Sequence, residues 1–184
     1  SRLDAQRLPN KPLKLINNKE MILHVYDAAV KSNAGEVYVA TPDQKIVDTV
    51  KNSGGNAIKT SNNHETGTDR IFEVFKDTLN GEPNIIINLQ GDMPNIEPQA
   101  ISNLVSYMNK EKCDIGTLAS DFNSKNEINN PNIVKVAVKE KFSENMFLNA
   151  FDFFRVNTNS TYNFYHHVGI YAFTNKALIR YVGL

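Results

Sequence analysis

A single carboxylate, Asp92, stands just after a short apolar run at residues 85–89 and is the first side chain that could do chemistry. The run reads IIINL, a composition typical of a strand that is buried on both faces of a parallel sheet. Ligands of open α/β sheets bind beyond the carboxyl ends of the strands, where a carboxylate can hold a metal-bound phosphate. A lone Asp after a strand can also simply cap a turn. Asp92 is therefore a candidate metal ligand whose role depends on the rest of the chain.

Basic side chains gather early in the chain, in a segment that Pro9 and Pro12 prevent from forming a helix. Arg2, Arg7 and Lys11 could wrap a triphosphate there, because guanidinium groups bind phosphate oxygens in pairs and an ammonium adds a compact charge. The segment lacks the glycine frame of a Walker loop. A basic loop can equally be a solvated surface, so phosphate binding is one of two roles that this segment allows.

The sequence HETGTDR at residues 64–70 combines hydroxyl groups, a flexible Gly67 and the backbone amides that open a helix. Such a loop suits recognition of a polar ring or an anion, although the same residues also make an ordinary helix cap. His64, like His24, has no partner at the spacing of a metal site. Both histidines are therefore expected to have surface or packing roles.

The elements that must position these residues alternate between strand-like and helix-like patterns. Strands are expected at residues 36–40, 57–58, 85–89, 114–120, 133–138 and 168–173. Helices are expected within residues 20–35, 46–50, 71–75, 101–108 and 176–182, while the Phe-rich segment 142–154 fits either element. The repeated strand–helix order predicts a single domain over residues 1–184, a three-layer α/β/α fold with a mostly parallel central sheet and right-handed crossovers.

The composition indicates a soluble protein without an extended surface for polyanions. The chain has 184 residues, with 20 Lys and Arg against 20 Asp and Glu; this allows one substantial core and gives no support for nucleic-acid or anionic-membrane partners. The lone Cys113 suits a reducing cytosol, and no membrane span or signal peptide is visible, so we expect a cytoplasmic location. Because an α/β domain normally opens with an apolar strand, we expect the native protein to have a first strand and a C-terminal part in addition to these residues.

Six short motifs occur together and in a fixed order. They are RLPNKP at residues 7–12, VAT at 39–41, TGTDR at 66–70, NLQGDMP at 88–94, NPNIVKV at 130–136 and HHVGIYAF at 166–173. Their order and spacing resemble those of the bacterial CMP-Kdo synthetases, the 3-deoxy-manno-octulosonate cytidylyltransferases of lipopolysaccharide synthesis, over essentially the whole chain. The resemblance implies a Rossmann-like nucleotidyltransferase fold of the nucleotide-diphospho-sugar transferase type.

The resemblance also implies a reaction, in which a homodimeric enzyme transfers CMP from CTP to 3-deoxy-D-manno-octulosonate (Kdo) with Mg²⁺ as cofactor. Arg2, Arg7 and Lys11 would bind the CTP phosphates. Lys11, Arg7 and Asp92 would be catalytic, with Asp92 as the magnesium ligand. The residues expected to border the nucleotide are Ala40, Thr41, Thr66, Gly67, Thr68, Arg70 and Gln90. Those expected to contact Kdo are Gln90, Arg155, His167 and Tyr171.

The sequence departs from the family pattern in places, and two other functions stay open. Pro42 stands where the family has an aspartate, DFFR at residues 152–155 replaces a tyrosine-rich motif, and the family's second metal aspartate would lie beyond Leu184. Without the resemblance, His167 and Tyr171 would be core positions on one face of a strand. The alternative functions are a cytidylyltransferase for another acid sugar, such as sialic acid, and a nucleotide-binding module without activity.

Overall fold

The computed structural model describes residues 8–141, 143, 146–156 and 162–184. The chain divides into two compact units. The first contains the residues up to 116 together with 171–184, and the second contains residues 117–170.

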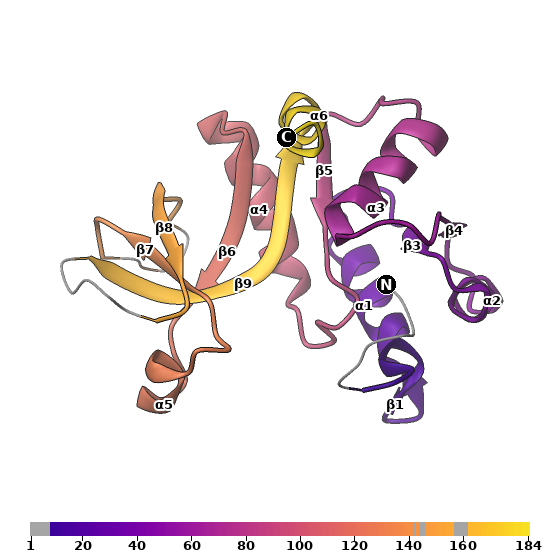
Figure 1. Cartoon of the computed structure of the whole chain (residues 1–184), viewed down its shortest axis with the longest axis horizontal. Coiled ribbons are helices and arrows are strands. Elements are labelled where there is room, and N and C mark those ends of the chain that lie inside the picture. The colour runs from indigo at the N-terminus through magenta and orange to yellow at the C-terminus, as the bar shows by residue number, and fades with distance from the viewer. Residues whose placement is uncertain (1–7, 142, 144–145, 157–161) are drawn as a thin grey trace. The chain divides into compact units, whose positions relative to one another are not determined.

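The first unit is a mixed α/β structure whose helices and strands follow one another along the chain (Figure 1). Its helices are the 3-10 turn η1 (Lys11–Leu13), α1 (Met21–Lys31), α2 (Gln44–Asn52), α3 (Gly67–Glu73), the π-helical turn η2 (Val74–Thr78), α4 (Pro98–Glu111) and α6 (Asn175–Val182). Its strands are β1 (Leu15–Ile16), β2 (Lys19–Glu20), β3 (Val39–Thr41), β4 (Ala57–Lys59), β5 (Ile85–Asn88) and the end of β9 (Asn163–Thr174). Helix α1 packs against α4, and α3 packs against α6. The predicted alternation of strands and helices is therefore confirmed in this unit.

Strands β3 and β4 and the helix α2 between them form a parallel strand–helix–strand motif with an aliphatic core. Val39 of β3 lies opposite Ala57 of β4, and both pack in one apolar cluster with Val50 from the buried face of α2. The turn into β4 requires Gly55, because a Cβ atom there would lie 2.8 Å from Val50 Cγ1 and 2.9 Å from Tyr26 Cζ. Tight packing at the end of α2 thus fixes where β4 begins.

Strand β5 pairs antiparallel with the end of β9. Ile85 lies opposite Thr174, and Asn88 lies opposite Tyr171. The three isoleucines of β5 are only half-buried, although the sequence predicted a strand buried on both faces. They are accessible because they line a cavity.

The second unit is built on antiparallel strands. Strand β7 (Lys135–Val138) pairs antiparallel with β8 (Ala150–Phe154) and with the first part of β9. Strand β6 (Ile115–Ser120) also pairs with β9, and the short helix α5 (Lys125–Asn129) lies between β6 and β7 in the chain. The Phe-rich segment that the sequence left ambiguous therefore contains a strand, β8.

The direction of strand pairing differs from the prediction. Among the pairs whose direction the structure describes, β3–β4 is parallel, whereas β1–β2, β5–β9, β7–β8 and β7–β9 are antiparallel. The prediction of a mostly parallel sheet is therefore wrong for the strands described. An apolar run specifies a strand with little exposed surface, but it does not specify the direction of the neighbouring strand.

The carboxyl ends of β4 and β5 both meet the start of α3. Thr60, directly after β4, accepts a hydrogen bond from Arg70 Nη1, and Asn88, the last residue of β5, donates one to Thr68 Oγ1. The polar segments that follow the two strands are thereby brought to the first turn of one helix. No helix in the part of the chain that the structure describes is long and apolar enough to cross a membrane.

Candidate active site

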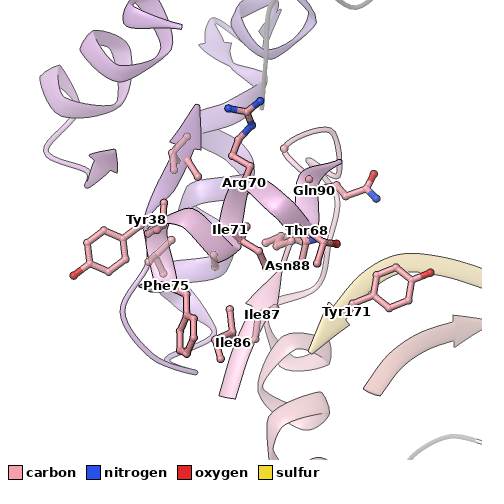
Figure 2. A pocket seen from close by; sticks show the side chains of 18 of the residues that line it. Tyr38, Thr68, Arg70, Ile71, Phe75, Ile86, Ile87, Asn88, Gln90 and Tyr171 are labelled. Carbon is pink, nitrogen blue, oxygen red and sulfur yellow. The ribbon is translucent and has the colours of Figure 1, made fainter. Parts of the chain in front are cut away.

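A cavity of about 1190 Å³ opens beside β5 in the first unit. In Figure 2, Arg70, Gln90 and Thr68 lie towards one end of the cavity, and the apolar Phe75 and Ile86 lie towards the other. We use the term polar part for a set of polar lining residues, which are Lys11, Thr66, Gly67, Thr68, Asn88, Gln90 and Asp92. We use the term apolar part for a set of apolar lining residues, which are Ile22, Val25, Val37, Val39, Val74, Phe75, Ile85, Ile86, Ile87 and Ile101.

Lys11 and Asp92 are in direct contact in the polar part. Lys11 Nζ lies 2.7 Å from Asp92 Oδ2, and the two side chains are 34% and 45% exposed. The η1 turn that carries Lys11 starts from Asn10 in a left-handed conformation (φ 58°) and is anchored by the buried Pro12. An ion pair this exposed adds at most about 1 kcal/mol to stability. The contact matters because it shows that the two side chains lie side by side. Lys11 of the basic N-terminal segment and the carboxylate behind β5, separate candidates in the sequence, lie at one place.

The start of α3 is closed by a reciprocal cap. Thr66 Oγ1 accepts a hydrogen bond from the Asp69 amide at 3.1 Å, and Asp69 Oδ2 accepts one from the Thr66 amide at 2.9 Å. The capping role that the sequence left open is therefore present, and Thr66 lines the cavity as well. The cap fixes the position of the following residues, Gly67 and Thr68.

Asn88 orients the Thr68 side chain. Asn88 is buried, and its Nδ2 donates a hydrogen bond to Thr68 Oγ1 at 3.1 Å. Because the Thr68 oxygen accepts this bond, its own proton can be donated elsewhere. Figure 2 shows the two side chains together beside the cavity. Sequence reasoning gave Asn88 no role, although a polar residue that ends an apolar strand was a usable signal.

Arg70 lines the cavity and also forms hydrogen bonds within the protein. Its buried guanidinium donates from Nη1 to Thr60 Oγ1 at 2.5 Å and to the Ser61 carbonyl at 2.8 Å, and the residue also lines the cavity. Arg70 therefore holds the loop that follows β4 against α3. Sequence patterns could not foresee this, because the partners are backbone and hydroxyl groups brought together only by the fold.

Glu73 and His64 tie the same loop to the other end of α3. The Glu73 carboxylate accepts hydrogen bonds from the Ser61 amide at 3.1 Å and from His64 Nε2. Burial acts to raise the pKa of Glu73, but the hydrogen bonds from His64 and Ser61 outweigh it, and the pKa lies below its ordinary value. His64 thus has a packing role, in line with the expectation from sequence.

The other residues expected at the nucleotide have different surroundings. Ala40 and Gln90 line the cavity, and so does Tyr171, whose pKa is raised by burial. Thr41 is fully buried, and its Oγ1 accepts a hydrogen bond from the Asp43 amide at 3.2 Å, so it supports the turn into α2. Arg2 and Arg7 lie outside the described residues.

Two residues expected to contact Kdo belong to the second unit. Arg155 Nη1 donates to the carbonyls of Asn132 at 3.1 Å and Pro131 at 3.4 Å. His167 is buried, its Nε2 lies 2.9 Å from Thr117 Oγ1, and burial lowers its pKa. Within this unit both side chains have protein partners.

A buried lysine, which sequence reasoning passed over, stands next to Arg155. Lys135 is fully buried, and its Nζ donates to the carbonyls of Asn130 at 2.6 Å and Arg155 at 2.8 Å. Burial, and then the nearby Arg155 charge, lower the pKa of Lys135. Lys135 and Arg155 together therefore hold the backbone of residues 130–132.

Asp92 is the side chain that could hold a metal ion at this site. In the described part of the chain, no three His, Cys, Asp or Glu side chains are grouped as a metal site. Mg²⁺, however, usually keeps several waters and binds proteins through one or two carboxylates together with substrate phosphates. A half-exposed carboxylate beside a lysine that can bind phosphate fits Mg²⁺ held jointly with a nucleotide.

Comparisons with known proteins give a consistent picture. The sequence profile of the cytidylyltransferase family matches residues 1–184. The 3-deoxy-manno-octulosonate cytidylyltransferase of Thermodesulfovibrio yellowstonii is 38% identical over 203 residues, covering 100% of this chain and 76% of that protein. The protein of the same name from Brucella ovis is 38% identical over 186 residues, covering 100% of this chain and 74% of that protein. A solved structure described as CMP:2-keto-3-deoxy-manno-octonic acid synthetase complexed with CTP matches with a TM-score of 0.87 at 37% identity, covering 100% of this chain and 75% of that one.

Proposed function

Because this chain belongs to the cytidylyltransferase family, we propose that it transfers CMP from CTP to Kdo, giving CMP-Kdo and pyrophosphate. This is an activation step in lipopolysaccharide biosynthesis. The relatives are named as 3-deoxy-manno-octulosonate cytidylyltransferases, and the solved relative is described as complexed with CTP. The observation on this chain that carries the proposal is the 2.7 Å contact between Lys11 and Asp92 at the polar part of the cavity.

In the proposed reaction the anomeric hydroxyl of Kdo attacks the α-phosphorus of CTP, and the bond to the leaving pyrophosphate breaks. The Lys11 ammonium, with the guanidinium groups of Arg7 and Arg2, balances the negative charge of the phosphates and of the leaving group. Asp92 would hold Mg²⁺, which supplies further positive charge to the phosphates when bound. Catalysis then consists of alignment and electrostatic stabilisation, without a covalent nucleophile.

The nucleotide is proposed to lie against the start of α3. Thr66, Gly67 and Thr68 line the polar part there, with Ala40 and Gln90 nearby on the cavity wall. The Thr68 hydroxyl, held by Asn88, can donate its proton to an acceptor on the nucleotide. Thr41 and Arg70 act in this proposal by fixing the loops that carry these groups.

The acid sugar is proposed to contact Gln90, Tyr171, His167 and Arg155. Gln90 and Tyr171 line the cavity of the first unit. His167 and Arg155 belong to the second unit. The hydrogen bonds of Arg155 to two backbone carbonyls compete with binding of the sugar's carboxylate. Among these four residues, Arg155 therefore has the least support from its surroundings.

The proposal extends to assembly and location. We place the protein in the cytoplasm, as a homodimer without nucleic-acid partners or membrane insertion. The feature that supports a dimer is β8, where Phe151 and Phe153 are 49% and 45% exposed. Residues two apart in a strand share a face, so β8 presents two large apolar side chains to the surface on one side.

The decisive experiment measures pyrophosphate release from CTP, Kdo and Mg²⁺ by the native protein and by Asp92→Asn. We expect the native protein to turn over and Asp92→Asn to lose nearly all of its turnover, because an amide cannot replace the charge of the carboxylate. Circular dichroism should show an unchanged fold, since Asp92 is half-exposed. Wild-type rates in Asp92→Asn would refute the assignment of this residue.

The same assay separates the two alternative functions. A screen over acid sugars, sialic acid included, distinguishes Kdo activation from transfer to another sugar acid. Binding of CTP without pyrophosphate release with any of these sugars would instead indicate a nucleotide-binding module.

A further inference from the structure

The side chain of His167, on β9, is held by three neighbouring segments of the second unit. The His167 amide donates to the Val134 carbonyl at 3.0 Å, directly before β7. Nε2 of the ring lies 2.9 Å from Thr117 Oγ1 of β6. Phe153 of β8 packs against the ring in a T-shaped arrangement, with 5.1 Å between the ring centroids. The imidazole therefore has a defined position, and the open question is which of its nitrogens carries a proton.

The Thr117 hydroxyl has a single proton to donate, and its oxygen lies near two carbonyls as well as the histidine. Oγ1 is 2.6 Å from the Ile170 carbonyl oxygen, 3.3 Å from that of Val168 and 2.9 Å from His167 Nε2. A carbonyl oxygen carries no proton, so a 2.6 Å contact with a hydroxyl requires the hydroxyl proton between the two oxygens. Thr117 therefore donates to Ile170, and Oγ1 meets His167 with a lone pair.

Nε2 of His167 must therefore be the protonated nitrogen of the ring. A lone pair on Nε2 would face a lone pair of Thr117 Oγ1, or else the hydroxyl proton would have to leave its contact with Ile170. Burial, and then the neighbouring His166 charge, lower the pKa of His167, which keeps the ring neutral. In a neutral imidazole the hydrogen bond of one nitrogen sets the state of the other. Nδ1 therefore carries a lone pair and acts as an acceptor.

An acceptor at Nδ1 distinguishes between the polar groups of an acid sugar. A sugar hydroxyl can donate a proton to it, whereas an ionised carboxylate has only lone pairs to offer. Any group that meets Nδ1 must therefore bring the proton of the hydrogen bond. The Nδ1–H tautomer would have the opposite preference, because it would donate to the carboxylate.

We propose that Thr117 is a positioning residue that fixes His167 as the Nε2–H tautomer, so that Nδ1 accepts a hydrogen bond from a hydroxyl group of the acid sugar and not from its carboxylate side. The proposal rests on the proposed function, in which His167 contacts Kdo. Thr117 itself need not touch the sugar, because it acts through the imidazole. Recognition of the carboxylate then falls to cationic or other donor groups of the site.

The first test reads the tautomer by NMR in the ligand-free chain with isotope-labelled histidine. Long-range proton–nitrogen correlations show which ring nitrogen bears a proton, and His167→Gln assigns the signals by removing one histidine of the four. We expect His167 to be protonated at Nε2 alone. In Thr117→Val the ratio of Nε2–H to Nδ1–H should fall about tenfold, and Thr117→Ser should restore it. An Nδ1–H ring in the native protein, or an unchanged ratio in Thr117→Val, would overturn the proposal.

A second spectrum distinguishes a hydroxyl partner from a carboxylate partner. It is recorded with Kdo and CMP, since CMP has no pyrophosphate to release. We expect Nδ1 of His167 to stay unprotonated, with its signal shifted towards that of a hydrogen-bonded acceptor. A proton gained by Nδ1 would identify the carboxylate as its partner and overturn the proposal. An unmoved His167 signal in a protein that turns over Kdo would do the same.

Steady-state pyrophosphate release then separates the sugar from the nucleotide. Thr117→Val should raise KM for Kdo about tenfold with KM for CTP unchanged, and Thr117→Ser should behave as the native protein does. Thr49→Val is the matched control, since Thr49 Oγ1 donates to the Lys45 carbonyl at 2.8 Å within α2. A shifted tautomer with an unchanged KM for Kdo would overturn the role in sugar binding.

Failure of the proposed function is distinguishable from failure of this inference. If the native protein releases no pyrophosphate with Kdo, the proposed function is refuted, and the contact between His167 and Kdo is refuted with it. The ligand-free spectra still decide whether Thr117 fixes the tautomer, because they require neither sugar nor turnover. The native spectrum also needs no variant, so it decides the tautomer even where Thr117→Val does not fold.

Discussion

At the scale of single residues, the candidate site consists of polar side chains whose partners fix where they point. Lys11 is held against Asp92, and Thr68 is held by Asn88. Both contacts lie in the polar part of one cavity and join segments far apart in the sequence. Because the exposed ion pair of Lys11 and Asp92 contributes little to stability, substitutions of these two residues should affect turnover much more than folding.

Lys11→Ala tests the phosphate-binding role of the lysine. Loss of a hydrogen bond from a charged group costs about 1.5–3 kcal/mol, so kcat/KM for CTP should fall about tenfold to hundredfold, with unchanged thermal stability. The measurement is steady-state pyrophosphate release at varied CTP. Lys14→Ala is the matched control, since Lys14 is an exposed lysine in the same segment. Equal CTP kinetics for the two variants would remove Lys11 from the site.

Asn88→Ala and Thr68→Val test whether Asn88 acts through the Thr68 hydroxyl. Each single substitution should lower kcat/KM, and the double variant should lose less than the sum, with a coupling of about 1 kcal/mol. Thr68→Ser retains the hydroxyl and should behave nearly as the native protein does. Strictly additive losses would show that the 3.1 Å contact between these side chains has no part in the reaction.

At the scale of elements, α3 organises the site because it is tied at both ends to the loop after β4. Arg70 binds Thr60 and Ser61, while Glu73 binds Ser61 and His64. The cap at Thr66 fixes the first turn. The residues that line the polar part therefore depend on side chains that need not touch a ligand.

Glu73→Gln should reveal this tie as a pH-dependent stability. The pKa of Glu73 is lowered in the folded protein, with the bonds from His64 and Ser61 outweighing burial. A lowered carboxyl pKa stabilises the fold above the ordinary pKa of the group, and the stabilisation is lost as the pH falls through the lowered value. At pH 7 we expect Glu73→Gln to be less stable by about 1 kcal/mol. The difference in stability should close as the pH falls below the ordinary pKa of a Glu carboxyl and through the lowered pKa of Glu73.

Urea unfolding at a series of pH values measures this difference. Glu82→Gln, which removes an exposed carboxylate from the same unit, is the control and should track the native protein throughout. If the free energies of unfolding of Glu73→Gln and the native protein differed by the same amount at every pH, the assigned stabilising role of the Glu73 carboxylate would be contradicted.

At the scale of the whole molecule, the proposed homodimer depends on the exposed aromatic side chains of β8. Phe151→Ser combined with Phe153→Ser should convert a dimer into a monomer at micromolar protein, because apolar side chains drive such interfaces. Sedimentation velocity measures the mass. Leu15→Ser removes an apolar side chain that is 62% exposed in the first unit and should leave the dimer intact. A monomeric native protein would refute the proposed assembly.

Sequence patterns predict those parts of this structure that depend on local signals. The alternation of elements follows from hydrophobic periodicity, and a candidate site behind β5 follows from the rule that ligands bind at strand ends. That Lys11 and Asp92 serve one site was implied by the resemblance to the CMP-Kdo synthetases. The direction of the β5–β9 pairing does not follow, because an apolar run is compatible with either direction. The buried positions of Arg70 and Lys135 do not follow either. Carbonyl and hydroxyl groups compensate for the water that these two side chains lose on burial, and only the folded chain brings those partners together.

The contact between Lys11 and Asp92 also determines how the site meets its ligands. While the two groups are paired, each partly neutralises the charge of the other. In the proposed reaction, a triphosphate that drew Lys11 away would leave the Asp92 carboxylate without its partner, and a cation bound at Asp92 would release the Lys11 ammonium. Binding of either ligand should therefore favour binding of the other. By thermodynamic reciprocity, CTP should tighten divalent-ion binding by the same factor as the ion tightens CTP binding.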